Sequence, residues 1–199
     1  MKEPMRCDWC GTDPLYVDYH DTLWGRPVTN SQELFAKLCL DGQQAGLSWI
    51  TILRKQTNYE AAFYQFDPEK IVRMTEEDIQ RQLQNPGIVR NRLKVESIIR
   101  NAKGYLAFQE RGEDFARFLW RFVDGRPIQN HWQTLKELPA TSAQSDAMAK
   151  ALKKAGFNFV GSTICYAFMQ AVGMINDHLV TCHCHEPCRS AGTAMAWES

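Results

Sequence analysis

The sequence has no excess of charge of either sign, no long hydrophobic run and no sustained alternation of apolar and polar residues. Its 23 Lys and Arg residues equal its 23 Asp and Glu residues, so any binding of nucleic acid has to use local basic patches. There is no run of 18 apolar residues that would cross a bilayer. A secretory signal and a lipidation motif are also missing, which favours a soluble, cytoplasmic protein with no membrane partner.

The missing alternation points to an all-α fold, because half-buried strands read with a period of two. At 199 residues the chain is long enough for one compact domain, which we expect over residues 1–185. Residues 126–144 read as a polar connector and residues 186–199 as a flexible tail.

Capping residues predict where several helices begin. The patterns start at Asn30, Thr57, Asp67 and Thr75. A longer helix is expected over about 88–106. The outer face of this helix is positively charged, which suits a phosphate backbone. It is formed by Arg90, Arg92, Lys94, Arg100 and Lys103.

The stretch from Ser145 to His178 reads as two helices joined by a tight hairpin. Apolar residues from Met148 to Ala155 follow a helical period, and the hairpin 156–161 has a glycine at each end. The second helix starts at Ser162-Thr163, and the free N–H groups of such a start form an anion site suited to a DNA phosphate. An ordinary packed pair of helices is the commoner reading of this pattern.

Seven cysteines is an odd number, and five of them lie near the two ends of the chain beside histidines. In a chain without a secretory signal this pattern favours metal ligands over disulfides, and mixed Cys and His ligands indicate zinc. The residues alone leave the four ligands open; one choice pairs Cys7 and Cys10 with two C-terminal cysteines. Either choice joins the chain's ends, which favours a structural site over a catalytic one. The candidates are Cys7, Cys10, His20, His178, Cys182, His183, Cys184, His185 and Cys188.

A second group combines one carboxylate with several aromatic residues. Asp41 is expected near Tyr16, Tyr19, Trp24 and Trp49. Aromatic faces with one anion suit a planar cationic ligand, through cation–π attraction and a charge-assisted hydrogen bond. The simpler alternatives are that the aromatic residues cover a core and that the carboxylate caps a backbone group.

From Arg6 to about Cys184 the chain resembles the 3-methyladenine DNA glycosylase I family of the helix–hairpin–helix superfamily. The resemblance rests on DPLYVDYHDTLWGRP, LFAKLCLDGQQAGLSWITILRK, FDPEKI and KALKKAGFNFVGSTICYAFMQAVGMINDH. It implies a base-excision repair enzyme, acting as a monomer, that flips out and hydrolytically removes 3-methyladenine from alkylated double-stranded DNA. Free 3-methyladenine is then the product, and no strand cleavage is expected.

The resemblance also implies roles for individual residues. A structural Zn²⁺ would be held by Cys7, His20, His178 and Cys182. The base would bind among Tyr16, Tyr19, Trp24, Asp41 and Trp49, with Asp41, Tyr19 and Trp49 closest to the chemistry and Trp49 as the stacking face. DNA would be contacted by Gly46, Leu47, Gly156, Phe159, Gly161, Ser162 and Thr163.

Two positions depart from related patterns. The family's pocket carboxylate is a glutamate, whereas this chain has Asp41, which is one methylene shorter. The superfamily's catalytic aspartate falls at Asn176, as is usual for this family. A non-enzymatic module that binds damaged DNA and a zinc hydrolase are the alternative readings.

Overall fold

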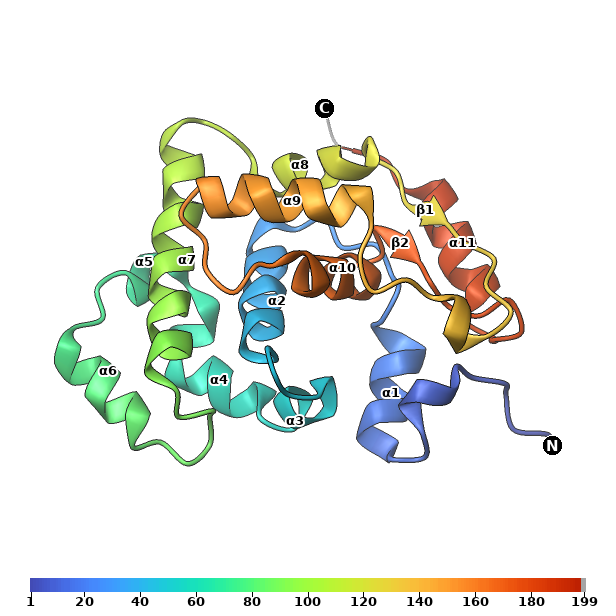
Figure 1. Cartoon of the computed structure of the whole chain (residues 1–199), viewed down its shortest axis with the longest axis horizontal. Helices are drawn as coiled ribbons and strands as arrows, with labels where there is room; N and C mark the ends of the chain where they lie inside the picture. The colour runs from blue at the N-terminus through green and yellow to red at the C-terminus, as the bar shows by residue number, and fades with distance from the viewer. Residues whose placement is uncertain (198–199) are drawn as a thin grey trace.

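Helix α2 (Ser31–Gln43) lies in the middle of the molecule and organises the other helices around it (Figure 1). Leu34, Phe35 and Leu38 follow the helical period and are completely buried. α2 contacts α3 (Trp49–Leu53), α7 (Arg92–Glu110), α8 (Phe115–Trp120) and α10 (Ser162–Ala171). The computed structural model describes residues 1–197, and within these the chain is mostly helical, as the missing alternation predicted.

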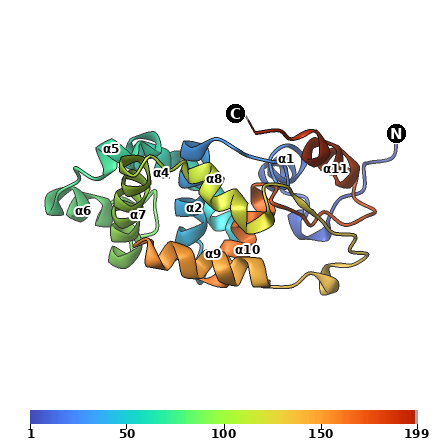
Figure 2. The same ribbon diagram turned by 90° about the horizontal axis from the view of Figure 1, so that it is seen from above.

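Around α2 the helices divide between two ends of the molecule. α4 to α7 lie at one end, whereas α1, α11 and the N-terminus lie at the other (Figures 1 and 2). The helices besides α2 are α1 (Pro14–Thr22), α3 (Trp49–Leu53), α4 (Gln56–Ala62), α5 (Pro68–Ile71), α6 (Glu76–Leu83), α7 (Arg92–Glu110), α8 (Phe115–Trp120), α9 (Ala143–Lys154), α10 (Ser162–Ala171) and α11 (His185–Ala194).

Side-chain caps explain where several of these helices begin. Asn30 caps α2, Asp67 caps α5, and Thr75 forms a capping box with Asp78 at α6, as predicted. The cap predicted at Thr57 is wrong, because α4 begins at Gln56 and Thr57 lies inside it. Lys55 occupies the N-cap position without a side-chain cap.

The predicted pair of helices around the hairpin is present as α9 and α10. Gly156 and Phe159 both have positive φ, which turns the chain sharply between the two helices. The hydroxyl of Ser162 does not cap α10. It bonds instead to Ser145 and Asp146 on α9, so it ties the two helices together.

The helix predicted over about 88–106 is α7 (Arg92–Glu110), so Arg90 lies before it and not on its outer face. The predicted outward-facing basic surface is also wrong at Lys94. Lys94 is only 6% exposed, and its ammonium donates to the carbonyls of Gln43 and Ala45 at the end of α2. A cation there stabilises the helix C-terminus and satisfies carbonyls that lack partners in the helix.

The C-terminal segment also differs from the predicted flexible tail. β1 (Ile128–Gln129) and β2 (Ile175–Asn176) form a short parallel pair, and α11 packs beside β2. Cys188 and Gly192 of α11 are buried. The apolar side of this helix therefore orders most of the predicted tail, whose residues 198–199 lie outside the described part. Across residues 1–197 no helix has the length and apolar character needed to span a membrane.

Candidate functional site

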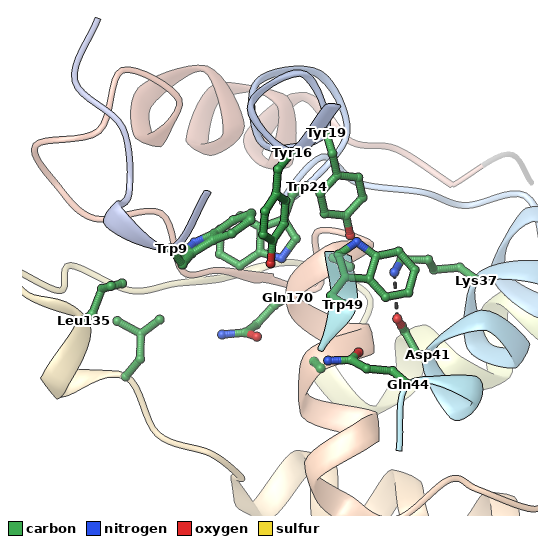
Figure 3. A pocket seen from close by; sticks show the side chains of 13 residues that line it. Trp9, Tyr16, Tyr19, Trp24, Lys37, Asp41, Gln44, Trp49, Leu135 and Gln170 are labelled. Carbon is green, nitrogen blue, oxygen red and sulfur yellow. Dashed lines mark hydrogen bonds and ion pairs between the residues drawn. The ribbon is translucent and has the colours of Figure 1, made fainter. Parts of the chain in front are cut away.

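A cavity of about 300 Å³ opens between α1, α2, the start of α3 and α10 (Figure 3). All five residues predicted to hold a ligand line it, although they come from three separate stretches of sequence. Its walls are formed by Trp9, Tyr16, Tyr19, Trp24, Lys37, Asp41, Gln44, Trp49, Leu135, Leu138, Ala167, Gln170 and Ala171. The size and largely aromatic lining are typical of a pocket for a small planar molecule.

The aromatic walls contact one another directly. The ring centroids of Tyr19 and Trp49 are 5.6 Å apart, and Trp9 lies 5.1 Å from Tyr16 and 4.9 Å from Trp24. Such tilted and edge contacts stabilise the rings in fixed orientations. Trp9 was not among the predicted pocket residues, and only its place beside Cys7 and Cys10 in an aromatic segment hinted at it.

Asp41 lies in the last turn of α2 and is 2% exposed. Its Oδ1 accepts a hydrogen bond of 2.7 Å from Nζ of Lys37, one helical turn earlier. The same ammonium lies 3.3 Å from the centroid of the Trp49 ring. Burial raises the pKa of the Asp41 carboxyl, while the Lys37 charge opposes that rise. Lys37 was missed at the sequence level, although its i,i+4 spacing from Asp41 was visible.

Two buried polar atoms of the pocket have no hydrogen-bond partner within residues 1–197. They are Oδ2 of Asp41, an acceptor, and Nε1 of Trp49, a donor. Leaving such groups unsatisfied is costly, so native proteins usually reserve them for a ligand or water. A molecule with a donor and an acceptor on its edge would satisfy both atoms.

Gln170 on α10 adds an amide to the pocket and is held from behind by Asp177. The Nε2 of Gln170 donates to Oδ2 of Asp177 over 2.9 Å. The buried Asp177 carboxylate also accepts from Asn130, Trp132 and Tyr166. Neither Gln170 nor Asp177 was predicted to belong to the site, because both depend on contacts between distant segments.

Asn176, the position of the superfamily's catalytic aspartate, lies outside the pocket lining. Its Nδ2 donates to Gln129 and to the His185 carbonyl, and its Oδ1 accepts from the His178 amide. The side chain is 1% exposed. These contacts give Asn176, the last residue of β2, a structural position.

The predicted DNA-contacting residues lie on two neighbouring loops and on the first turn of α10, which follows one of them. Gly46 and Leu47 are exposed on the turn between α2 and α3, and Leu47 is 43% exposed despite its apolar side chain. The hairpin that carries Gly156, Phe159 and Gly161 packs against the end of α2, where a Cβ on Gly42 would lie 3.2 Å from Phe159. Gly161 gives α10 no side-chain cap, so the first N–H groups of that helix lack both a cap and an acceptor in the helix. Thr163 in this first turn is exposed.

A second constellation joins the two ends of the chain. The ligand atoms of Cys7, His20, His178 and Cys182 all lie within 4.8 Å of one another, and all four residues are buried. These four residues could hold a metal ion. Hydrogen bonds, the largest from Cys184, lower the pKa of the Cys182 thiol, and the resulting thiolate is the form that binds metals.

The neighbours of this cluster fix the orientation of both imidazoles. Nδ1 of His20 lies 2.7 Å from Oδ1 of Asp21, and Nε2 of His178 lies 2.9 Å from the Trp24 carbonyl. This leaves the other nitrogen of each ring facing the cysteines, an arrangement typical of metal sites. Cys10 does not join the group, since its thiol donates to the Cys7 carbonyl. Cys10 therefore lies outside the group of residues that could hold a metal ion with Cys7.

A family model described as methyladenine glycosylase matches residues 9–185. The chain belongs to this family. It is 54% identical over 180 residues to DNA-3-methyladenine glycosylase 1 of Escherichia coli. The matched region covers 90% of this chain and 96% of the relative. A crystal structure of 3-methyladenine DNA glycosylase I superposes with a TM-score of 0.90 at 56% identity, covering 91% of this chain and all of that one.

A further glycosylase of this family, from Staphylococcus aureus, was solved to define the structural basis of 3-methyladenine recognition. It matches with a TM-score of 0.88 at 39% identity and covers 90% of this chain and 96% of that one. The fold of the methyladenine glycosylases thus extends over nearly the whole chain. The pocket-lining residues and three of the four cluster residues lie within the range that the family model matches, and Cys7 lies just before it.

Proposed function

We propose that this methyladenine glycosylase is a base-excision repair enzyme that removes 3-methyladenine from alkylated double-stranded DNA. The observation that carries the proposal is the aromatic pocket, in which Oδ2 of Asp41 and Nε1 of Trp49 are buried without partners. An adenine offers both donors and acceptors on its edge and a flat face for stacking. The names of the relatives point to the same base.

Methylation at the ring nitrogen gives adenine a positive charge and weakens its bond to the sugar. The enzyme therefore need not protonate the base, but it has to move the nucleotide out of the stack and into the pocket. We assign the stacking face to Trp49, the enclosing aromatic walls to Tyr16, Tyr19 and Trp24, and the hydrogen-bond acceptor to Asp41. Water then attacks the sugar as the base leaves.

A monofunctional reaction follows from the position of Lys37. A lysine that cleaves the strand must be free to attack the sugar as an uncharged amine. Burial lowers the pKa of Lys37, but the Asp41 carboxylate opposes that shift, and the Lys37 nitrogen is held between this carboxylate and the Trp49 ring. We therefore expect base release without strand cleavage.

The two loops described above supply the DNA contacts in this proposal. The exposed Leu47 at the turn beside the pocket suits an apolar wedge that enters the gap left by the flipped base. The hairpin with the free N–H groups of α10 suits a backbone phosphate, as in the helix–hairpin–helix motif. Lys150, Lys153 and Lys154 of α9 are exposed and near the same end.

The Cys and His cluster fits a structural Zn²⁺. Tetrahedral zinc with bonds of about 2.3 Å to sulfur and about 2.0 Å to nitrogen separates S and N ligand atoms by about 3.5 Å. The observed separations are 3.6 Å from Cys7 to His178, 3.4 Å from Cys182 to His20 and 3.5 Å from Cys182 to His178. Four protein ligands leave no open position for a substrate, so zinc would hold the ends of the chain together.

The experiment that tests this function is incubation with methylated duplex DNA, followed by chromatography of the released bases. We expect free 3-methyladenine and intact strands. A non-enzymatic module would bind an abasic duplex and release no base. A zinc hydrolase would lose activity on mild chelation while its fold persisted, and either result would overturn the proposal.

A further inference from the structure

The base pocket contains a second charge besides that of Asp41. Among the pocket-lining residues within 1–197, Lys37 is the only basic side chain. Its ammonium contacts Asp41 at 2.7 Å and lies 3.3 Å from the Trp49 centroid and 5.6 Å from that of Tyr19. A cationic base would make the same kinds of contact. The protein without a ligand therefore already holds a cation at the position where the positive charge of the lesion would be stabilised.

Three other titratable groups near this pair carry no charge. They are Tyr16 and Tyr19 on α1 and Cys165 on α10. Burial raises the pKa of both tyrosines and raises the pKa of Cys165 to about 12, so all three stay protonated. Glu33 and Glu60 face Lys37 from a neighbouring cavity, which Lys37 and Trp49 also line, but neither glutamate lines the base pocket. The charge of the base pocket itself is therefore set by Lys37 and Asp41, which cancel.

We propose that Lys37 is a specificity-determining residue that makes this pocket favour the base after it has lost its positive charge over the charged base still attached to DNA. The inference rests on the proposed glycosylase activity and concerns the charge change within that reaction.

The charge change follows from the bonds. When the bond between the base nitrogen and the sugar carbon breaks, its electron pair stays with the base, which departs neutral, and the positive charge passes to the sugar. The oxygen of water bonds to the sugar carbon, and the released proton goes to solvent. No oxidant or reductant takes part.

A lone carboxylate beneath the base would stabilise the charged substrate more than the departing base. Stabilising the ground state in this way raises the barrier, because only interactions stronger in the transition state accelerate a reaction. The Lys37 ammonium offsets the Asp41 charge, and it repels the bound cation less as the charge moves to the sugar. Asp41 meanwhile keeps Oδ2 as an acceptor for the base edge.

The test compares the wild-type protein with Lys37→Met, whose unbranched side chain is one heavy atom shorter and carries no charge. Lys37→Arg keeps the charge, and Lys70→Met on the exposed surface of α5 is the remote control. Single-turnover release of 3-methyladenine and the Kd for the lesion duplex are measured at mildly alkaline pH. Protonation of bound free 3-methyladenine is followed by its ultraviolet spectrum as pH is lowered.

We expect Lys37→Met to bind the lesion duplex more tightly and to release the base more slowly, each by about tenfold. The bound free base should become protonated about one pH unit higher than in the wild type, the equivalent of tenfold. Lys37→Arg should stay close to the wild type in all three measurements. This opposed change in Kd and rate is the signature of lost ground-state destabilisation.

A parallel loss of rate and affinity would overturn the inference, since it would mean that Lys37 only supports the pocket. Tighter binding of charged and neutral base alike would also overturn it, because Lys37 would then merely block the pocket and swing into the neighbouring cavity. If the wild type binds free 3-methyladenine but releases none from DNA, the proposed function fails. The spectral titration then still decides whether Lys37 sets the charge preference.

Discussion

The Sγ atom of Cys182 lies 3.4 Å from Nε2 of His20, a contact between residues 162 positions apart. A metal ion bound between them would close almost the whole chain into one loop. Closing long loops restricts the unfolded state, and metal affinity adds to the free energy of folding. The cluster should therefore contribute to stability far more than to chemistry.

Replacing Cys182 by serine should remove the metal and lower the free energy of unfolding together. We expect a loss of about 3 kcal/mol or more, which corresponds to about 10 °C in Tm for a chain of this length. Metal content by mass spectrometry and thermal melting are the measurements. Cys10→Ser is the matched control, because this buried thiol lies outside the cluster and should keep the metal. A metal-free Cys182→Ser protein with unchanged melting and full activity would contradict a structural role.

Asp177 should matter through Gln170 and not through contact with the base. Four side chains donate hydrogen bonds to the Asp177 carboxylate. In Asp177→Asn the amide nitrogen cannot accept, so at least one buried donor loses its acceptor, which lowers the free energy of unfolding by about 1–3 kcal/mol. We expect lower Tm and weaker binding of free 3-methyladenine, measured by calorimetry. If Gln170→Ala binds the base as well as the wild type does, the amide takes no part in recognition and only the stability effect should remain.

The hairpin can be tested without disturbing the fold. A Cβ on Gly161 would meet nothing within 4 Å, and its φ of −62° suits any residue, so Gly161→Leu should fold normally. The bulky side chain would keep a phosphate from the first N–H groups of α10. We expect weaker binding to every duplex, with or without a lesion, because backbone contacts carry no base information. Leu47→Ala should instead weaken lesion binding selectively. Lost lesion discrimination in Gly161→Leu with full duplex affinity would mean that the hairpin lies elsewhere on the DNA.

Local rules predicted much of the fold, although the cap at Thr57 was wrong, and they missed features that depend on contacts between distant segments. Caps such as Asn30 and Thr75 act within one turn, so the sequence pattern was enough to find them. The burial of Lys94 depends on where α7 meets the end of α2, and nothing near Lys94 in sequence reveals that. Similarly, α11 is ordered by its contact with β2. The polar, glycine-containing sequence of this segment does not predict that contact.

The same distinction holds for the candidate site. The aromatic residues of one segment and the carboxylate of another, taken with the family resemblance, predicted five residues that line the pocket, whereas Trp9 and Gln170 were not predicted. Lys37 was not predicted, because a long flexible side chain on a helix usually reaches solvent and here bends over Trp49. The charge of the pocket could therefore be read only from the structure.

Asp41 can be tested by two substitutions that separate charge from reach. Asp41→Asn keeps the size and removes the charge, so binding of free 3-methyladenine should weaken by about 1.5–3 kcal/mol, the value of a hydrogen bond to a charged group. It also leaves the buried Lys37 ammonium without its counter-ion, which should lower Tm. Lys37→Met combined with Asp41→Asn separates these two effects, because the double variant has no unpaired cation.

Asp41→Glu restores the residue expected from the family resemblance. The pocket has about 300 Å³ of space, and Oδ2 lacks a partner, so a longer side chain has room to reach toward the base. We expect affinity to hold or rise, provided that the Lys37 pair is kept. Weaker binding would instead indicate that the backbone has adapted to aspartate, since an added methylene in a packed site causes strain. Calorimetric titration with the free base gives the affinities, and base release from methylated duplex gives the rates. Unchanged binding and release in Asp41→Asn would contradict the assignment of Asp41 as the acceptor and leave recognition to the aromatic walls.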